Sequence, residues 1–84
     1  MRLDKYLKVS RLIKRRTVAN EACDSARVSV NGKTVKPSYD VKIGDEITIA
    51  FGAKEVTVRV LDIRETTKKT ESIGMYEVVS ESNA

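Results

Sequence analysis

The sequence contains no histidine and no tryptophan, and only one cysteine and one proline occur among its 84 residues. Without histidine, the commonest general acid–base group and the commonest metal ligand are both missing, which leaves only Asp, Glu and Lys chemistry for an enzyme. A single cysteine cannot form an intramolecular disulfide, and this fits a reducing compartment. No apolar run reaches the ~18 residues of a membrane span, and no apolar signal core follows Met1. We therefore expect a soluble, cytoplasmic protein without a metal or cofactor.

Charge is distributed unevenly along a chain that is long enough for one small domain. Residues 1–36 contain ten basic and three acidic residues, a net charge of +7, whereas residues 37–84 contain six basic and nine acidic residues, a net charge of −3. The first sixteen residues hold seven basic side chains, four of them arginine, against Asp4 alone. A solvated helix surface is one explanation of such a cluster. Few interleaved acids and many arginines, whose planar forks suit phosphate oxygens, favour a polyanion-binding face.

Hydrophobic spacing predicts two short helices in the first third of the chain. The first covers residues 2–9, and residues 10–16 form either a connector or a further helical turn. The second is predicted to start at Thr17, whose hydroxyl can cap the first turn. Its apolar stripe consists of Val18, Ala19, Ala22, Cys23 and Ala26. Because Cys23 lies on this stripe without a histidine or local cation, we interpret it as a packed core thiol.

From residue 27 onward the apolar period changes to two, which indicates strands. Val28 and Val30 precede Asn31-Gly32, the strongest short hairpin signal, and a type I′ turn is expected there. The return strand is predicted to end before Pro37. Two further strands would alternate through Ile47, Ile49 and Phe51, and through Val56, Val58 and Val60. A polar loop at 66–72, a last strand at 73–79 with Tyr76 and Val78 on one face, and a frayed tail at 80–84 complete an α+β chain.

Three stretches of residues 1–50 together resemble the S4-type RNA-binding domain: RLDKYL, RLIKRRTVANEA and RVSVNGKTVKPSYDVKIGDEITI. The order and spacing of these motifs make the resemblance specific. One position departs from the family pattern, because Ala26 stands where a glycine usually ends the second helix. Glycine adopts positive φ without steric cost, so we expect this helix to end differently.

The resemblance implies an α+β S4-type (αL) fold, with two short N-terminal helices packed on a small, mainly antiparallel sheet. Residues 1–50 would be the RNA-binding domain, and residues 51–84 a C-terminal β extension of it with a frayed tail. Asp4 is expected at the helix start, paired with Lys8. Replacing Arg2 or Arg16 by alanine is expected to weaken RNA binding and leave stability unchanged. The RNA-facing residues carried over by position are Arg2, Lys5, Arg11, Lys14, Arg15, Arg16 and Lys33.

At 84 residues the chain leaves no room for the catalytic domains that accompany this module in pseudouridine synthases and tyrosyl-tRNA synthetases. Instead it resembles stand-alone S4-type factors of bacterial ribosome-associated quality control, which are similar to heat-shock S4-type ribosome-binding proteins. This resemblance implies a monomeric, non-enzymatic protein that binds 23S rRNA of the large ribosomal subunit and P-site peptidyl-tRNA. It would support C-terminal alanine tailing of stalled chains by a partner elongation factor.

Three other functions are weighed against this one. A generic structured-RNA binder could act as a translational regulator or ribosome assembly factor. A truncated RNA-modifying enzyme would depend on a partner subunit, and the absence of histidine and of any plausible acid–base pair argues against it. A protein-interaction module would have no role with nucleic acid, and salt-insensitive binding would favour it.

Overall fold

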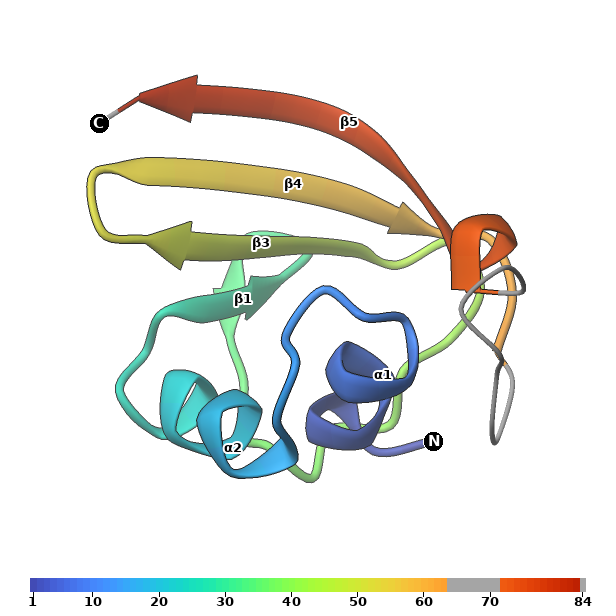
Figure 1. Cartoon of the computed structure of the whole chain (residues 1–84), viewed down its shortest axis with the longest axis horizontal. Coiled ribbons are helices and arrows are strands. Elements are labelled where there is room, and N and C mark those ends of the chain that lie inside the picture. Colours follow the sequence, from blue (N-terminus) through green and yellow to red (C-terminus); the bar gives the residue numbers. More distant parts are fainter. Residues whose placement is uncertain (64–71, 84) are drawn as a thin grey trace.

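The computed structural model describes residues 1–63 and 72–83. In these residues two helices lie on one face of a five-stranded antiparallel sheet with the strand order β2-β1-β3-β4-β5 (Figure 1). This arrangement confirms the predicted α+β class, with two N-terminal helices packed on a sheet. The elements are α1 (Leu3–Val9), α2 (Arg16–Asp24), β1 (Val28–Val30), β2 (Lys33–Thr34), β3 (Glu46–Phe51), β4 (Lys54–Val60), the 3-10 helix η1 (Ser72–Met75) and β5 (Tyr76–Asn83).

Helix α1 is tied to parts of the chain that lie far away in sequence. The N–H groups of Leu3 and Asp4 donate to the carbonyls of Tyr39 and Pro37 at 2.8 and 3.1 Å. These bonds satisfy donors that the first turn of a helix leaves without an intrahelical partner. The apolar side of α1 consists of Leu3, Tyr6 and Leu7, and it is fully buried, as the spacing of these residues predicted. The helix therefore has a fixed position over the sheet although it has only seven residues.

Helix α2 begins one residue earlier than the sequence predicted. Arg15 occupies the N-cap position with extended backbone angles, and no side chain in the described residues caps the helix. The prediction that Thr17 is the cap is therefore wrong, because Thr17 already lies inside the first turn. Asn20, where a capping box would need Glu, instead donates to the carboxylate of Asp4 at 3.2 Å. Asn20 therefore links the two helices instead of taking part in a capping box.

The end of α2 keeps glycine-like geometry without glycine. Ala26 has φ of 60°, in the left-handed region. Its N–H donates to the carbonyl of Cys23 at 3.2 Å, and that of Arg27 donates to the carbonyl of Ala22 at 2.9 Å. This is the Schellman pattern, in which a glycine usually occupies the position of Ala26. The expectation that this helix ends differently is therefore wrong: it ends as a glycine-terminated helix would, and we infer that Ala26 adds backbone strain.

The hairpin between β1 and β2 follows the sequence signal closely. Asn31 and Gly32 have φ of 52° and 82°, as a type I′ turn requires, and Val30 pairs with Lys33. The side chain of Asn31 has a second role. Its Oδ1 accepts the N–H of Glu46 at 3.0 Å, and its Nδ2 donates to Asp45 at 3.2 Å. The hairpin tip is thus attached to the turn before β3.

The middle of the sheet supplies the floor of the core. The inward residues that the alternation predicted on β3 and β4 are buried, with one exception at the end of β3. Phe51 is 43% exposed, because it lies where β3 passes into the turn at Gly52. Val18 of the predicted α2 stripe is also 47% exposed, and Ala26 is exposed as well. The buried members are Ile47, Ile49, Val56, Val58 and Val60.

The C-terminal end differs most from the sequence prediction. Residues 73–75 belong to the 3-10 helix η1 rather than to a strand, and β5 continues to Asn83, so the predicted frayed tail at 80–84 is wrong as far as Asn83. Tyr76 and Val78 do share the face of Val60 and Val58, as predicted, yet Val78 is 55% exposed. Figure 1 shows why: β5 is the sheet edge farthest from the helices. The predicted loop at 66–72 lies almost entirely outside the described residues.

Candidate nucleic-acid interface

Six of the seven candidate RNA-binding residues lie on the two helices, between them or directly before the first one. Arg2 directly precedes α1, Lys5 is in its first turn, and Arg15 and Arg16 lie at the start of α2. Arg11 and Lys14 belong to the connector between the helices. All are exposed except Lys5, which is half-buried. We call these six residues the basic surface. Lys33, the seventh candidate, is exposed at the first position of β2.

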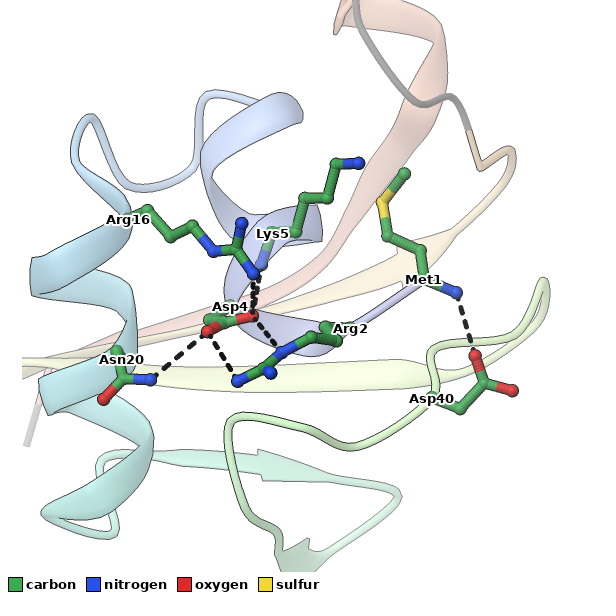
Figure 2. Close-up of polar contacts among 7 residues, drawn as sticks. All are labelled: Met1, Arg2, Asp4, Lys5, Arg16, Asn20 and Asp40. Atoms are coloured by element: carbon green, nitrogen blue, oxygen red, sulfur yellow. Dashed lines mark hydrogen bonds and ion pairs between the residues drawn. The ribbon is translucent and has the colours of Figure 1, made fainter.

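A buried carboxylate lies beneath part of this surface. Asp4 is 2% exposed, and Figure 2 shows donors converging on it from both helices. Its Oδ1 accepts the backbone N–H of Lys5 at 2.8 Å and Nε of Arg2 at 3.2 Å. Its Oδ2 accepts Nη2 of Arg2 at 3.3 Å and Nδ2 of Asn20 at 3.2 Å, and Nη2 of Arg16 forms an ion pair with Oδ1 at 3.6 Å. We call these five residues the Asp4 cluster.

These contacts keep Asp4 ionised. Burial on its own would raise the pKa of this carboxyl, because the charged form loses hydration. The hydrogen bonds from Asn20, from Arg2 and from the backbone N–H of Lys5, together with the charge of Arg16, outweigh burial and lower the pKa below its usual 3.8. Asp4 is therefore negatively charged at neutral pH and can hold two guanidinium groups in place.

The Asp4 cluster corrects one expectation from the sequence and argues against a second. The contacts of Asp4 are with Arg2, Arg16 and Asn20 rather than with the predicted partner Lys8. Arg2 and Arg16 are also part of the fold, so the expectation that replacing them leaves stability unchanged is not supported. The side chains of both arginines are nevertheless about half exposed, at 52% and 48%. Each guanidinium thus faces Asp4 on one side and solvent on the other.

The connector presents its basic side chains from a constrained backbone. Helix α1 ends at Val9, and Arg11 follows in the left-handed region with φ of 65°. The N–H of Arg11 donates to the carbonyl of Lys8, and that of Ile13 donates to the carbonyl of Leu7, both at 3.0 Å. Ile13 is buried. Residues 10–15 therefore form a turn, not a continued helix, and the exposed side chains of Arg11 and Lys14 project from it to solvent. Arg16, which the sequence placed in the same segment, already belongs to α2.

Cys23 takes no part in a reactive site. It is 3% exposed within the core, which agrees with its interpretation as a packed thiol. Burial, followed by the negative charges of Asp4 and Asp24, raises the pKa of the Cys23 thiol to about 11.

Across residues 1–63 and 72–83, no group of three or more His, Cys, Asp or Glu side chains is placed to hold a metal. In the same residues no helix has the length and apolarity to cross a membrane.

Sequence reasoning found the basic residues but missed what organises them. Asp4 is predicted at the helix start with Lys8 as its partner, although its position three residues before Leu7 puts both on the buried side of α1. A polar residue at a buried helical position indicates a partner, since buried polar groups are nearly always hydrogen-bonded. That signal could have revealed Asp4, although not which residues bind it.

The comparisons with known proteins agree with this geometry. Residues 1–47 match the S4 domain. The chain is 58% identical over 81 residues to the RQC P-site tRNA stabilizing factor of Bacillus subtilis. The aligned residues cover 96% of this chain and 94% of that protein. It is 55% identical over 82 residues to the protein of the same name from Streptococcus pneumoniae, covering 98% of this chain and 93% of that protein.

A solved structure extends the similarity to the whole fold. The trimeric heat shock protein 15 of Vibrio cholerae has a TM-score of 0.88 and 32% identity to this chain. The match covers 95% of this chain and 82% of that one. The common architecture therefore includes the C-terminal strands as well as the two helices.

Proposed function

Since the chain belongs to the S4 domain family, we propose that it is a non-enzymatic RNA-binding factor that acts on the ribosome. The observation that carries this proposal is the pair of guanidinium groups fixed around Asp4. A guanidinium has five N–H donors, and Asp4 engages two of those on Arg2. Since the side chains of Arg2 and Arg16 are about half exposed, donors that Asp4 does not engage can bind phosphate oxygens in a fixed orientation.

The basic surface suits structured RNA better than a single phosphate group. Arg11, Lys14 and Arg15 are exposed and form no ion pair with any residue in the described part of the chain. Their charge is available to a backbone that crosses both helices and the connector. RNA helices are recognised mainly by shape and by contacts to phosphate and 2′-hydroxyl groups, which requires no base-specific reading. The basic surface can therefore bind RNA without catalysing a reaction on it.

The finer proposal concerns the RNA itself. We propose that the protein binds 23S rRNA of the large ribosomal subunit together with P-site peptidyl-tRNA, in quality control of stalled nascent chains. Its role would be to hold the tRNA while a partner elongation factor adds alanine residues to the chain. The names of the relatives, which are similar to this protein over 96% of its length, support the tRNA and quality-control parts. The role of a holder is supported by the basic surface, which offers exposed cationic side chains from both helices and the connector.

A pull-down of the tagged protein from cells tests this proposal. Sequencing of the bound RNA and mass spectrometry of the bound proteins should recover large subunits with tRNA and without small subunits. Messenger RNA or small-subunit precursors would instead identify a regulator or an assembly factor. In vitro, contact with roughly five phosphates predicts a slope of log affinity against log salt of about −3.5 to −4.5. Salt-insensitive binding would exclude RNA as the ligand.

A further inference from the structure

A groove of about 460 Å³ lies beside the basic surface, between α2, the connector and the end of β3. Figure 1 shows α2 and the end of β3 at the same side of the molecule, with the 25–27 turn linking α2 to β1. The groove is lined by Leu12, Ile13, Lys14, Val18, Ala22, Arg27, Ile49, Ala50, Phe51 and Gly52.

Its walls are apolar and open to solvent. Phe51 and Val18 are 43% and 47% exposed, although both belong to apolar patterns that predict inward positions. The floor is closed, because Ile49 and Ala22 are buried. The groove therefore offers an aromatic ring and an aliphatic side chain that the described part of the fold leaves accessible.

The backbone on both sides of the groove is fixed. The N–H of Ala50 donates to the carbonyl of Arg27 at 2.8 Å, which joins β3 to the end of α2. The N–H of Arg27 donates to the carbonyl of Ala22 at 2.9 Å within the helix terminus. A ligand would thus enter a preformed site, and little conformational entropy would be lost on binding.

Charge indicates what kind of ligand fits. Lys14 and Arg27 are the charged residues among those lining the groove, and none of the described lining residues carries a carboxylate. Lys14 also belongs to the basic surface and directly precedes Arg15 and Arg16. The groove is therefore complementary to a ligand that combines a flat apolar part with negative charge, and it is continuous with the surface proposed to bind phosphates.

We propose that this groove accepts one unpaired nucleobase of the bound RNA, stacked on Phe51, while Lys14 and Arg27 contact the flanking phosphates. The proposal rests on the RNA-binding function proposed above. Aromatic side chains commonly stack on bases that have left an RNA helix, and such stacking does not depend strongly on base identity. An acidic, apolar peptide has similar chemistry, but the continuity of the groove with the basic surface through Lys14 favours RNA.

The test compares two RNA stem-loops with the full chain. One carries a single bulged adenosine, and the other carries an abasic nucleotide at the same place, so the phosphates are equal in number. We expect the protein to bind the bulged RNA about 5- to 150-fold more tightly than the abasic one, the range that base stacking supplies. Phe51→Ala should abolish this preference and leave binding to the abasic RNA unchanged. Phe51→Tyr, which keeps an aromatic ring, should retain it.

Val78→Ala is the matched control, because Val78 is an apolar residue of similar exposure on the distant strand β5. Phe51 is also the sole phenylalanine, so its ring protons provide an assigned NMR signal that should shift with the bulged RNA and not with the abasic RNA. If Phe51→Ala unfolds, this signal in the unaltered protein decides the question. Equal affinity for both RNAs, with salt-dependent binding intact, would overturn the groove proposal alone. Failure to bind either RNA would overturn both proposals.

Discussion

The balance between arginine and carboxylate side chains differs between the helical end of the molecule and the outer face of the sheet. Around α1 and α2, one carboxylate, Asp4, contacts two guanidinium groups, and further basic side chains lie beside them. On the sheet face away from the helices, Arg59 on β4 lies between Glu46 and Glu77, with N–O distances of 3.3 and 2.8 Å. Arginine is thus in excess at one end and outnumbered by carboxylates at the other.

The difference shows how a modest net charge becomes a binding surface. The Arg59 pairs are exposed and are expected to add little stability. The Asp4 cluster is buried on its acidic side and exposed on its basic side, so it stabilises the contact between the helices while keeping positive charge at the surface. Arginine and carboxylate side chains therefore neutralise each other on the sheet. On the helices, the same kind of pair leaves positive charge at the surface, where a ligand can bind it.

Removing one carboxylate from each end should break this comparison most clearly. Asp4→Asn places an amide N–H₂ against the donors of Arg2 and Asn20, and we expect the free energy of unfolding to fall by about 2–3 kcal/mol. Glu77→Gln, the matched change on the sheet, should leave the urea midpoint unchanged within error. Equal losses for the two variants in urea denaturation would mean that Asp4 is no more structural than a surface carboxylate.

Low pH should remove the negative charge of Asp4 by protonation, without the change of side chain that a substitution introduces. The pKa of Asp4 is lower in the folded protein than its ordinary value, so its stabilising effect is complete above pH ~4 and is lost as pH falls through the folded pKa. The difference in unfolding free energy between the wild type and Asp4→Asn should therefore shrink from pH 7 toward low pH. Asp40, whose pKa the N-terminal ammonium lowers, is present in both proteins and cancels. A difference that stays constant with pH would contradict the assignment.

Replacing one arginine at each end should change RNA binding at the helical end only and change stability at neither end. Arg15→Ala removes an exposed guanidinium that has no ion pair among the described residues, and should weaken binding to ribosomal RNA about 5-fold and reduce the salt slope by about 1. Arg59→Ala is the control and should change neither quantity. Melting temperatures should match the wild type in both variants. Equal weakening by the two changes would show that only net charge matters.

The smallest expected effect is a gain in stability at a helix end. Because Ala26 has φ of 60°, Ala26→Gly should relieve the left-handed strain and stabilise the protein by about 1 kcal/mol, or raise the melting temperature by about 4–8 °C. Arg11 has φ of 65°, so Arg11→Gly should show a similar gain in thermal melts, together with weaker RNA binding. A loss of stability in Ala26→Gly would mean that the methyl group contributes more than the strain costs.

Local patterns predicted the parts of the fold whose conformation is decided locally. Asn31-Gly32 determines its own turn, and the alternation of Val56, Val58 and Val60 follows directly from burial on one face. The second half of β5 could not be predicted in the same way, because residues 80–83 are polar and gain their strand structure from pairing with β4. Tertiary contact overrides local preference there.

The candidate site divides along the same line. Positions of the basic residues follow from motif and composition, so their exposure could be anticipated. Their arrangement depends on Asp4 and Asn20, which lie sixteen residues apart in sequence and meet at 3.2 Å. No periodicity encodes that meeting, since it arises from how α2 packs on α1.

One hydrogen bond has a consequence for how the protein is made. The hydroxyl of Tyr6 donates to the carbonyl of Met75 at 2.8 Å, and both residues are fully buried. Chain closure over 69 residues is slow compared with local helix formation. Helix α1 can form early in synthesis, but its core is complete only when the last strand region has been made. Residue 75 must therefore be synthesised and released from the ribosome before the chain reaches the fold with which, as we propose, it returns to bind one.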